Sequence, residues 1–210
     1  MDFKKLVLAS SASAALAFSA TAVSAQDGWY GAIDAGMHQM EDGINAESTS
    51  GVTWEWEVNQ GWAAFARAGY RFNPNWRVEL EAGHRSGDIG TVRRFTDAVP
   101  SGLCNLTPSS GPCFSPAGDI ESNTLMANVL YDFDFGGSIT PFVGLGLGFN
   151  NVNTEALGNL RGDRTATLQA DDSSTEFAMQ GIAGLAWALN DRTNIDLTYR
   201  YLTGDASWET

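Results

Sequence analysis

Lysine, cysteine and proline are scarce in this 210-residue chain, which contains only two cysteines and six prolines. Its two lysines, Lys4 and Lys5, both lie at the N-terminus, so every later basic residue is an arginine. The chain carries 25 acidic residues against 12 basic ones, a net charge of −13 at pH 7. Such a charge argues against nucleic acid as a partner, because nucleic-acid binding requires a basic surface.

Long apolar runs are also lacking after the N-terminus, which excludes transmembrane helices from the rest of the chain. Residues 1–25 have the features of a secretory signal peptide: the charged Lys4 and Lys5, an apolar run over residues 6–18, and the small-residue site Val23-Ser24-Ala25. A membrane-anchoring helix is the alternative, but serines interrupt a run that is too short to span a bilayer. We predict cleavage before Gln26.

The predicted mature chain, residues 26–210, has a length that suits one domain. Removing the signal peptide leaves 10 basic and 24 acidic residues, a net charge of −14. Cys104 and Cys113 are predicted to form a disulfide within one loop, since an exported protein reaches an oxidising compartment. We expect this bridge to contribute about 2 to 3 kcal/mol to stability. Metal binding by two isolated cysteines is the poorer interpretation.

The segment TPFVGLGLGFN (Thr140 to Asn150) has the clearest pattern in the chain. Large apolar residues alternate with three glycines, at Gly144, Gly146 and Gly148, and a period of two predicts a β-strand. Glycines in register indicate a sheet that curves sharply around a narrow interior. The large residues would then face outward, most simply toward lipid. A nucleotide-binding loop is disfavoured, because no helix start follows the glycines.

Six further stretches alternate in the same way, which predicts seven strands in all. They are separated by connections that run long, short, long, short, long, short, as in an up-and-down barrel with tight turns at one end and long loops at the other. Three polar, largely acidic loops are expected over residues 39–60, 86–119 and 151–172. In the first, Trp54 and Trp56 alternate with Glu55 and Glu57, which favours an extension of the strand pair beyond the membrane. The predicted strands are residues 28–38, 61–72, 76–85, 120–135, 140–150, 173–189 and 193–202.

Aromatic residues concentrate at the ends of these strands, as they do in the interfacial girdles of membrane barrels. The predicted girdle residues are Trp62, Tyr70, Phe72, Trp76, Phe133, Phe135, Trp187, Tyr199 and Tyr201. The fold class predicted is therefore all-β, an antiparallel up-and-down transmembrane β-barrel. A soluble lipocalin-like barrel is the alternative; it would turn the large apolar faces inward, and it would remain monomeric without detergent.

The signal peptide, AGYRFNPNWRVELEAGHR, YDFDFGGSITPFVGLGLGFN and DLTYRYLTGD together resemble a known family. It is the family of small eight-stranded outer-membrane barrels of Gram-negative bacteria, of the OmpA-like and "outer membrane protein beta-barrel" type. The resemblance implies a monomeric barrel in the cell outer membrane, inserted by the outer-membrane assembly machinery and surrounded by lipid and lipopolysaccharide. It implies no cofactor, and the partner of the external loops is left open.

One feature departs from the family, whose members finish with an eighth strand that ends in an aromatic residue. This chain stops at Ser207-Trp208-Glu209-Thr210, and seven strands would leave an open edge in lipid. The eighth strand is expected to lie beyond Thr210, with closure by an N-terminal or loop strand as the alternative.

The charged faces of the predicted strands form a set that would line the barrel interior. In a barrel of eight strands the side chains fill the interior, so an ion-paired plug is expected, with a small ion-conducting channel as the alternative. Arginine suits the plug because its planar guanidinium pairs bidentately with carboxylates. His38 shares this face. The predicted network is Asp34, Arg67, Arg71, Arg77, Glu79, Glu81, Arg85, Asp132, Asp134, Asp196 and Arg200.

An enzymatic alternative depends on His84 and Ser86, which share one strand face near the outer rim. Outer-membrane lipid A deacylases look similar in placing a histidine two residues before a serine, where the histidine activates the serine. No acidic residue is identified here to orient the histidine, and so short a spacing carries little information. The chain is therefore predicted to be a non-enzymatic barrel without catalytic, metal or cofactor-binding residues, with a structural role in the envelope or a role in surface contacts.

Overall fold

A computed structural model describes residues 6–22, 28–40, 44–47, 53–95, 101–104, 117–160, 163–190 and 193–208. The described residues include no helix long and apolar enough to cross a membrane. The strands are β1 (Leu6–Ala22), β2 (Gly28–Met40), β3 (Ile44–Glu47), β4 (Thr53–Val58), β5 (Gly61–Arg71), β6 (Trp76–Phe95), β7 (Ser101–Cys104), β8 (Ala117–Asp132), β9 (Ile139–Leu160), β10 (Asp163–Asn190) and β11 (Thr193–Trp208).

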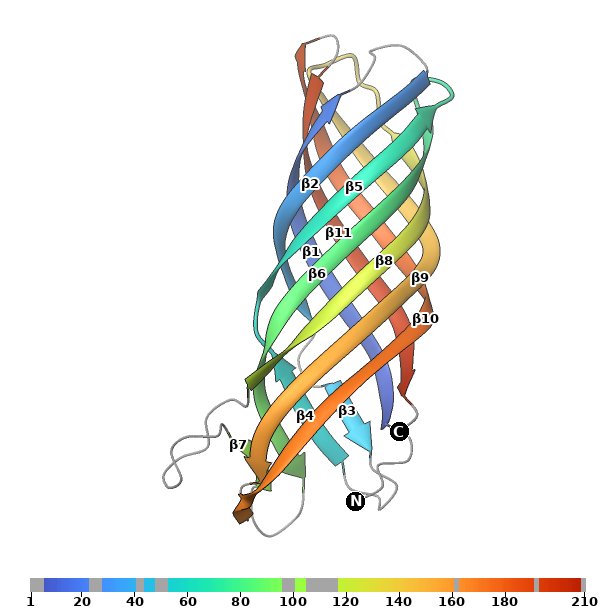
Figure 1. Cartoon of the computed structure of the whole chain (residues 1–210). Helices are drawn as coiled ribbons and strands as arrows, with labels where there is room; N and C mark the ends of the chain where they lie inside the picture. Colours follow the sequence, from blue (N-terminus) through green and yellow to red (C-terminus); the bar gives the residue numbers. More distant parts are fainter. Residues whose placement is uncertain are drawn as a thin grey trace.

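Eight of these strands close into a ring through antiparallel pairing alone. The order around the ring is β1, β2, β5, β6, β8, β9, β10 and β11, and β11 pairs back with β1. The strands are inclined to the long axis of the barrel, and β3, β4 and β7 lie together at one end (Figure 1). We call this the loop end; the opposite end, where β5 meets β6 and β8 meets β9, is the turn end. The predicted up-and-down barrel is therefore confirmed.

All seven predicted strands occur in the predicted order, but several are longer than expected. The prediction of three long loops is wrong over much of their length: β6 continues to Phe95, and β9 and β10 together span most of residues 151–172. The first predicted loop contains β3 and β4. The physical reason is visible in β9, where Val152, Thr154 and Ala156 are buried although they alternate with the polar residues Asn151, Asn153 and Glu155. The period of two continues beyond the apolar residues.

The turn end is built by short-range hydrogen bonds. The Asn73 Oδ1 atom accepts hydrogen bonds from the backbone nitrogens of Asn75 and Trp76, at 2.9 and 3.0 Å. In the next turn Gly136 has a φ of +73°, a backbone conformation that favours glycine. The predicted turn at Asn73-Pro74-Asn75 is confirmed, since this stretch joins β5 to β6.

The eighth place in the ring is taken by β1, which pairs with β2 on one side and β11 on the other. The expected position of the closing strand, beyond Thr210, differs from this arrangement; the N-terminal alternative is the one observed. Pairing with β1 satisfies the backbone groups of both neighbouring strands, which would otherwise be exposed to hydrocarbon. The signal peptide remains a prediction, and cleavage before Gln26 would remove β1.

Removing the N-terminal residues tests whether β1 closes the barrel. We expect the chain that begins at Gln26 to lose the faster gel migration that a closed barrel shows before boiling, because β2 and β11 would each expose an unpaired edge. The full chain, folded in the same detergent, is the control and should migrate faster unboiled. An equal mobility shift for both chains would contradict a closing role for β1.

The glycines of β9 face inward, as predicted, and they make room for side chains of the neighbouring strands. A Cβ atom at Gly146 would lie 2.0 Å from the Asn128 Oδ1 atom, and one at Gly148 would lie 2.0 Å from the Leu125 carbonyl oxygen. On the opposite face Leu145 is 75% exposed, and Val143, Leu147 and Phe149 are also exposed. The large apolar residues therefore cover the outside of the barrel, which contradicts the lipocalin-like alternative.

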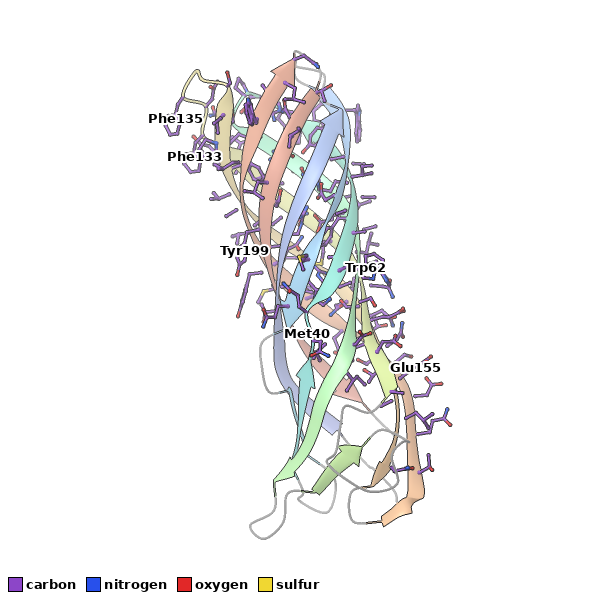
Figure 2. All side chains as sticks on the ribbon, turned by 90° about the vertical axis from the view of Figure 1, so that its left-hand side faces the viewer. Met40, Trp62, Phe133, Phe135, Glu155 and Tyr199 are labelled. Atoms are coloured by element: carbon purple, nitrogen blue, oxygen red, sulfur yellow. The ribbon has the colours of Figure 1, made fainter. Side chains whose placement is uncertain are left out.

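This apolar surface is bounded at both ends. Phe133 and Phe135 lie at the turn end and Trp62 lies farther toward the loop end, with Glu155 beyond it (Figure 2). Rings touch around the turn end, for example Trp76 with Tyr131 at 5.0 Å between ring centroids. Toward the loop end the outward residues become polar along one row of paired strands. This polar row is His84, Asn123, Asn151 and Thr175.

Candidate functional site: the charged lumen

Inward positions of the strands bring the charged residues together in the barrel interior. Asp34 comes from β2, Arg67 from β5, Glu79 and Glu81 from β6, and Arg200 from β11, and each is at most 4% exposed. Because alternate residues of a strand face the same side, a charge at every second position is sufficient to place these groups in one lumen.

Arg67 lies at the centre of the network and contacts three carboxylates. Its Nη2 atom is 2.8 Å from the Asp34 Oδ1 atom and 3.2 Å from the Asp196 Oδ2 atom, while its Nη1 atom is 3.1 Å from the Glu79 Oε1 atom. The four residues come from four different strands of the ring. One guanidinium therefore links strands that are far apart in the sequence.

Arg200 provides the second centre of the network. Its Nη2 atom pairs with Asp34, and its Nε atom donates to the Glu81 Oε2 atom at 2.9 Å. The other Glu81 oxygen accepts a hydrogen bond of 3.1 Å from the Gln180 side-chain amide. The Arg200 guanidinium also lies 4.2 Å from the centroid of the Phe65 ring. Stacking on an aromatic face suits the weakly hydrated guanidinium.

Toward the turn end the network continues through Arg77. Its Nη1 atom is 2.9 Å from the Glu79 Oε1 atom, and its Nε atom is 3.1 Å from the Asp132 Oδ1 atom. Arg71, whose side chain is partly exposed, lies 3.0 Å from the other Asp132 oxygen. The hydroxyl of Tyr30 donates to the Glu79 Oε1 atom at 2.7 Å. Glu79 is therefore held by three different side chains.

Arg85 is buried but has no carboxylate among its described hydrogen-bond partners. Its Nη1 atom donates to the Thr124 hydroxyl at 3.2 Å, and its guanidinium lies 4.9 Å from the centroid of the Phe65 ring. His38 lies nearby on β2, where its Nε2 atom is 3.0 Å from the Ser86 carbonyl oxygen. Arg85 thus belongs to the lumen without joining the ion pairs.

Asp134 is a correction to the predicted network. It is exposed at the turn end, where its Oδ1 atom accepts a 2.8 Å hydrogen bond from the Gly136 backbone nitrogen. The predicted strand continued to residue 135, but β8 ends at Asp132. Beyond that residue the alternation of faces no longer places a side chain in the lumen.

Uncharged polar lumen residues were missing from the predicted set, among them Tyr30, Asn128 and Gln180. Asn128 accepts a 2.7 Å hydrogen bond from Gln180, and Tyr30 binds Glu79 as described above. Their positions in the alternation already placed Tyr30 with Asp34 and Asn128 with Asp132. A search restricted to charged residues missed them, although uncharged polar groups also need partners when buried.

Apolar side chains fill the lumen on either side of the ion pairs. Leu130, Phe142 and Ile182 pack together nearer the turn end. Met126, Ala178 and Leu202 form a second buried cluster. Ion pairs and apolar clusters together occupy the interior, as expected for a barrel of eight strands.

His84 and Ser86 lie on the outward face of β6, as predicted. The His84 Nδ1 atom is 2.8 Å from the Asn123 side-chain oxygen, and its ring packs against Trp62 at 4.9 Å between centroids. The neighbour of the imidazole is therefore an amide, where a deacylase would need an acid to orient the base. In the described part of the chain no group of three histidine, cysteine or acidic side chains is arranged to hold a metal ion.

Cys104 is the last residue of β7, whereas Cys113 lies outside the described residues. The predicted disulfide between them therefore stays a prediction.

A closed antiparallel ring with an apolar outside and a charged, packed inside defines a transmembrane β-barrel. The model of the outer membrane protein beta-barrel domain matches residues 7–207. The chain belongs to this family of outer-membrane barrel proteins.

Two relatives and two solved structures illustrate its similarities. An uncharacterized protein of Brucella abortus is 32% identical over 138 residues, which cover 64% of this chain and 48% of the relative. An outer membrane protein of Gluconacetobacter diazotrophicus is 26% identical over 181 residues, covering 78% of this chain and 40% of the relative. The chain thus spans about half the length, or less, of these relatives.

Among solved structures, Neisserial surface protein A matches with a TM-score of 0.39 and 12% identity, over 96% of this chain and 97% of that one. The attachment invasion locus protein of Yersinia pestis, in complex with the heparin analogue sucrose octasulfate, matches with a TM-score of 0.32 and 13% identity. The match covers 98% of this chain and 99% of that one.

Proposed function

We propose that this protein is a non-enzymatic outer-membrane barrel whose lumen is a closed, ion-paired plug and whose loop end makes contacts outside the cell. The plug is supported by one observation: among the described residues, four buried arginines and five buried carboxylates face the lumen, with the half-buried Arg71 beside Asp132. The arginines are Arg67, Arg71, Arg77, Arg85 and Arg200; the carboxylates are Asp34, Glu79, Glu81, Asp132 and Asp196. Pairing between these opposite charges offsets the cost of burying them.

The proposed location and partners rest on the family to which the chain belongs. In this proposal the barrel is exported through its N-terminal signal peptide, inserted as a monomer by the outer-membrane assembly machinery, and held among lipid and lipopolysaccharide. Because β1 lies within that predicted signal peptide, cleavage before Gln26 would require another strand to take the place of β1 between β2 and β11. The apolar band between the turn-end aromatics and the polar row supports this placement, since aromatic residues favour the interface between hydrocarbon and water. Nucleic acid is not a proposed partner, because the net negative charge of the chain would repel the phosphate backbone.

A conductance measurement tests the plug. The full chain, folded in detergent and reconstituted into a planar lipid bilayer, is expected to show no steady ohmic conductance, because the lumen side chains leave no continuous water path. A reconstituted porin in the same bilayer is the positive control. A steady conductance from the barrel would favour the ion-channel alternative and overturn the proposal of a closed lumen.

A lipid A deacylase would depend on His84 and Ser86, so a matched test separates the enzyme from the structural barrel. The full chain should release no acyl chain from lipid A above the level of a Ser86→Ala variant. Release by the parent chain that the variant lacks would overturn the non-enzymatic proposal.

A further inference from the structure

Some lumen contacts join side chains from two strands that both pair with the strand between them. The side-chain amide of Gln180 on β10 donates to the Asn128 Oδ1 atom on β8 at 2.7 Å. Both residues pair with Gly146 of β9, so this hydrogen bond passes over Gly146 on the inner side of the wall. A Cβ atom at Gly146 would lie 2.0 Å from the Asn128 Oδ1 atom and 2.8 Å from the Gln180 Cγ atom. The crossing contact therefore requires the smallest residue beneath it.

The same arrangement occurs at β1, the strand that closes the ring. We call the place that β1 occupies between β2 and β11 the seam. Arg200 of β11 pairs with Asp34 of β2. Arg67 of β5 contacts Asp34 at 2.8 Å and Asp196 of β11 at 3.2 Å. Because the two strands that flank a third are about 10 Å apart, these buried ion pairs must bridge the seam along the inner side of β1.

The residues of β1 on the inward face at this level are all small. Ser19 pairs with Asp34 on one side and with Asp196 on the other. Ala17 and Ala15 hold the next two positions of the same face, since alternate residues of a strand share a face. A larger residue at any of these positions would have to displace side chains that are held by ion pairs, as a Cβ atom would in the centre of β9.

We propose that the seam selects the strand that closes the barrel by the size of its inward residues. A closing strand must carry small residues at the positions of Ala15, Ala17 and Ser19, because the ion pairs of Asp34 occupy the space over them. Residues on the opposite face meet lipid, which accepts large apolar side chains. A segment that took the place of β1 after cleavage before Gln26 would have to meet the same requirement. Selection at the seam concerns closure of the ring, so it is independent of whether the lumen conducts ions.

Matched leucine substitutions in the full chain test this selection. Ala17→Leu enlarges an inward position, whereas Ala20→Leu makes the same change on the outward face, where Ala20 pairs with the exposed Ile33. After folding in the same detergent, Ala17→Leu should lose most of the faster unboiled gel band and Ala20→Leu should keep it. Gly146→Leu is the positive control and should lose the band as well. An undiminished band from Ala17→Leu, or an equal loss from Ala20→Leu, would overturn the proposal.

A compensating variant distinguishes crowding at the seam from a general failure to fold. Thr198 of β11 pairs with Ala17 and is 1% exposed, and its hydroxyl has no hydrogen-bond partner among the described residues. Thr198→Gly removes as many heavy atoms beside Ala17 as Ala17→Leu adds. The double variant should therefore recover the faster band, whereas Thr198→Gly should not rescue Gly146→Leu. A double variant no better than Ala17→Leu would overturn selection by size, while the conductance of the parent chain decides the proposed plug separately.

Discussion

Glu79→Ala is expected to lower the free energy of unfolding by about 3 to 5 kcal/mol. The substitution removes the carboxylate that binds the guanidinium of Arg67, the guanidinium of Arg77 and the hydroxyl of Tyr30. Two buried cations would then share the remaining acids, and a buried charge without its partner is more costly than the pair was favourable. Urea unfolding of the chain in lipid vesicles, followed by tryptophan fluorescence, measures the change.

Two matched variants sharpen this result. Glu155→Ala removes an exposed carboxylate from the outside of β9 and should change stability by less than about 0.5 kcal/mol. Glu79→Gln keeps a hydrogen-bond acceptor for Tyr30 but loses the negative charge. It should therefore lower the free energy of unfolding by more than Glu155→Ala and by less than Glu79→Ala. If Glu79→Ala leaves stability unchanged, water fills the lumen and screens the arginines, and the plug is contradicted.

Leu145→Arg is expected to cost about 2 to 4 kcal/mol of folding free energy in lipid, the range found for arginine near the middle of a bilayer. Leu145 is 75% exposed and lies midway along β9 between Ile139, where the strand begins, and Asn151 in the polar row. At that level an arginine on the outer face would have to leave water for hydrocarbon. Arginine at Leu80 or Val129, which face outward on neighbouring strands, should have similar effects.

The control for this prediction lies on the same strand and the same face. Asn153→Arg introduces the same side chain on the loop-end side of the polar row, where water is available, and should be close to neutral. Folding of all variants into vesicles under identical urea concentrations measures the difference. Near-zero effects at Leu145, Leu80 and Val129 together would reverse the assignment of inside and outside.

Much of the barrel could be predicted from the sequence because the period of strands is local. Alternation of large and small residues in Thr140–Asn150 was sufficient to give a strand, a curved sheet and the side that faces lipid. The same alternation placed Arg67, Glu79 and Glu81 on inward faces. These inferences need only neighbouring residues, and the backbone geometry of a strand decides them.

Other features depended on tertiary structure. The partners of Glu79 come from strands that are distant in the sequence, and strand tilt and register decide which charges meet. Closure by β1 and the exposed position of Asp134 depend on where strands begin and end, which the local alternation of residues does not show. The sequence by itself therefore determined the class of fold and the two faces of its wall. The tertiary structure alone decided which charges pair and which strand closes the ring, because both depend on contacts between residues far apart in the chain.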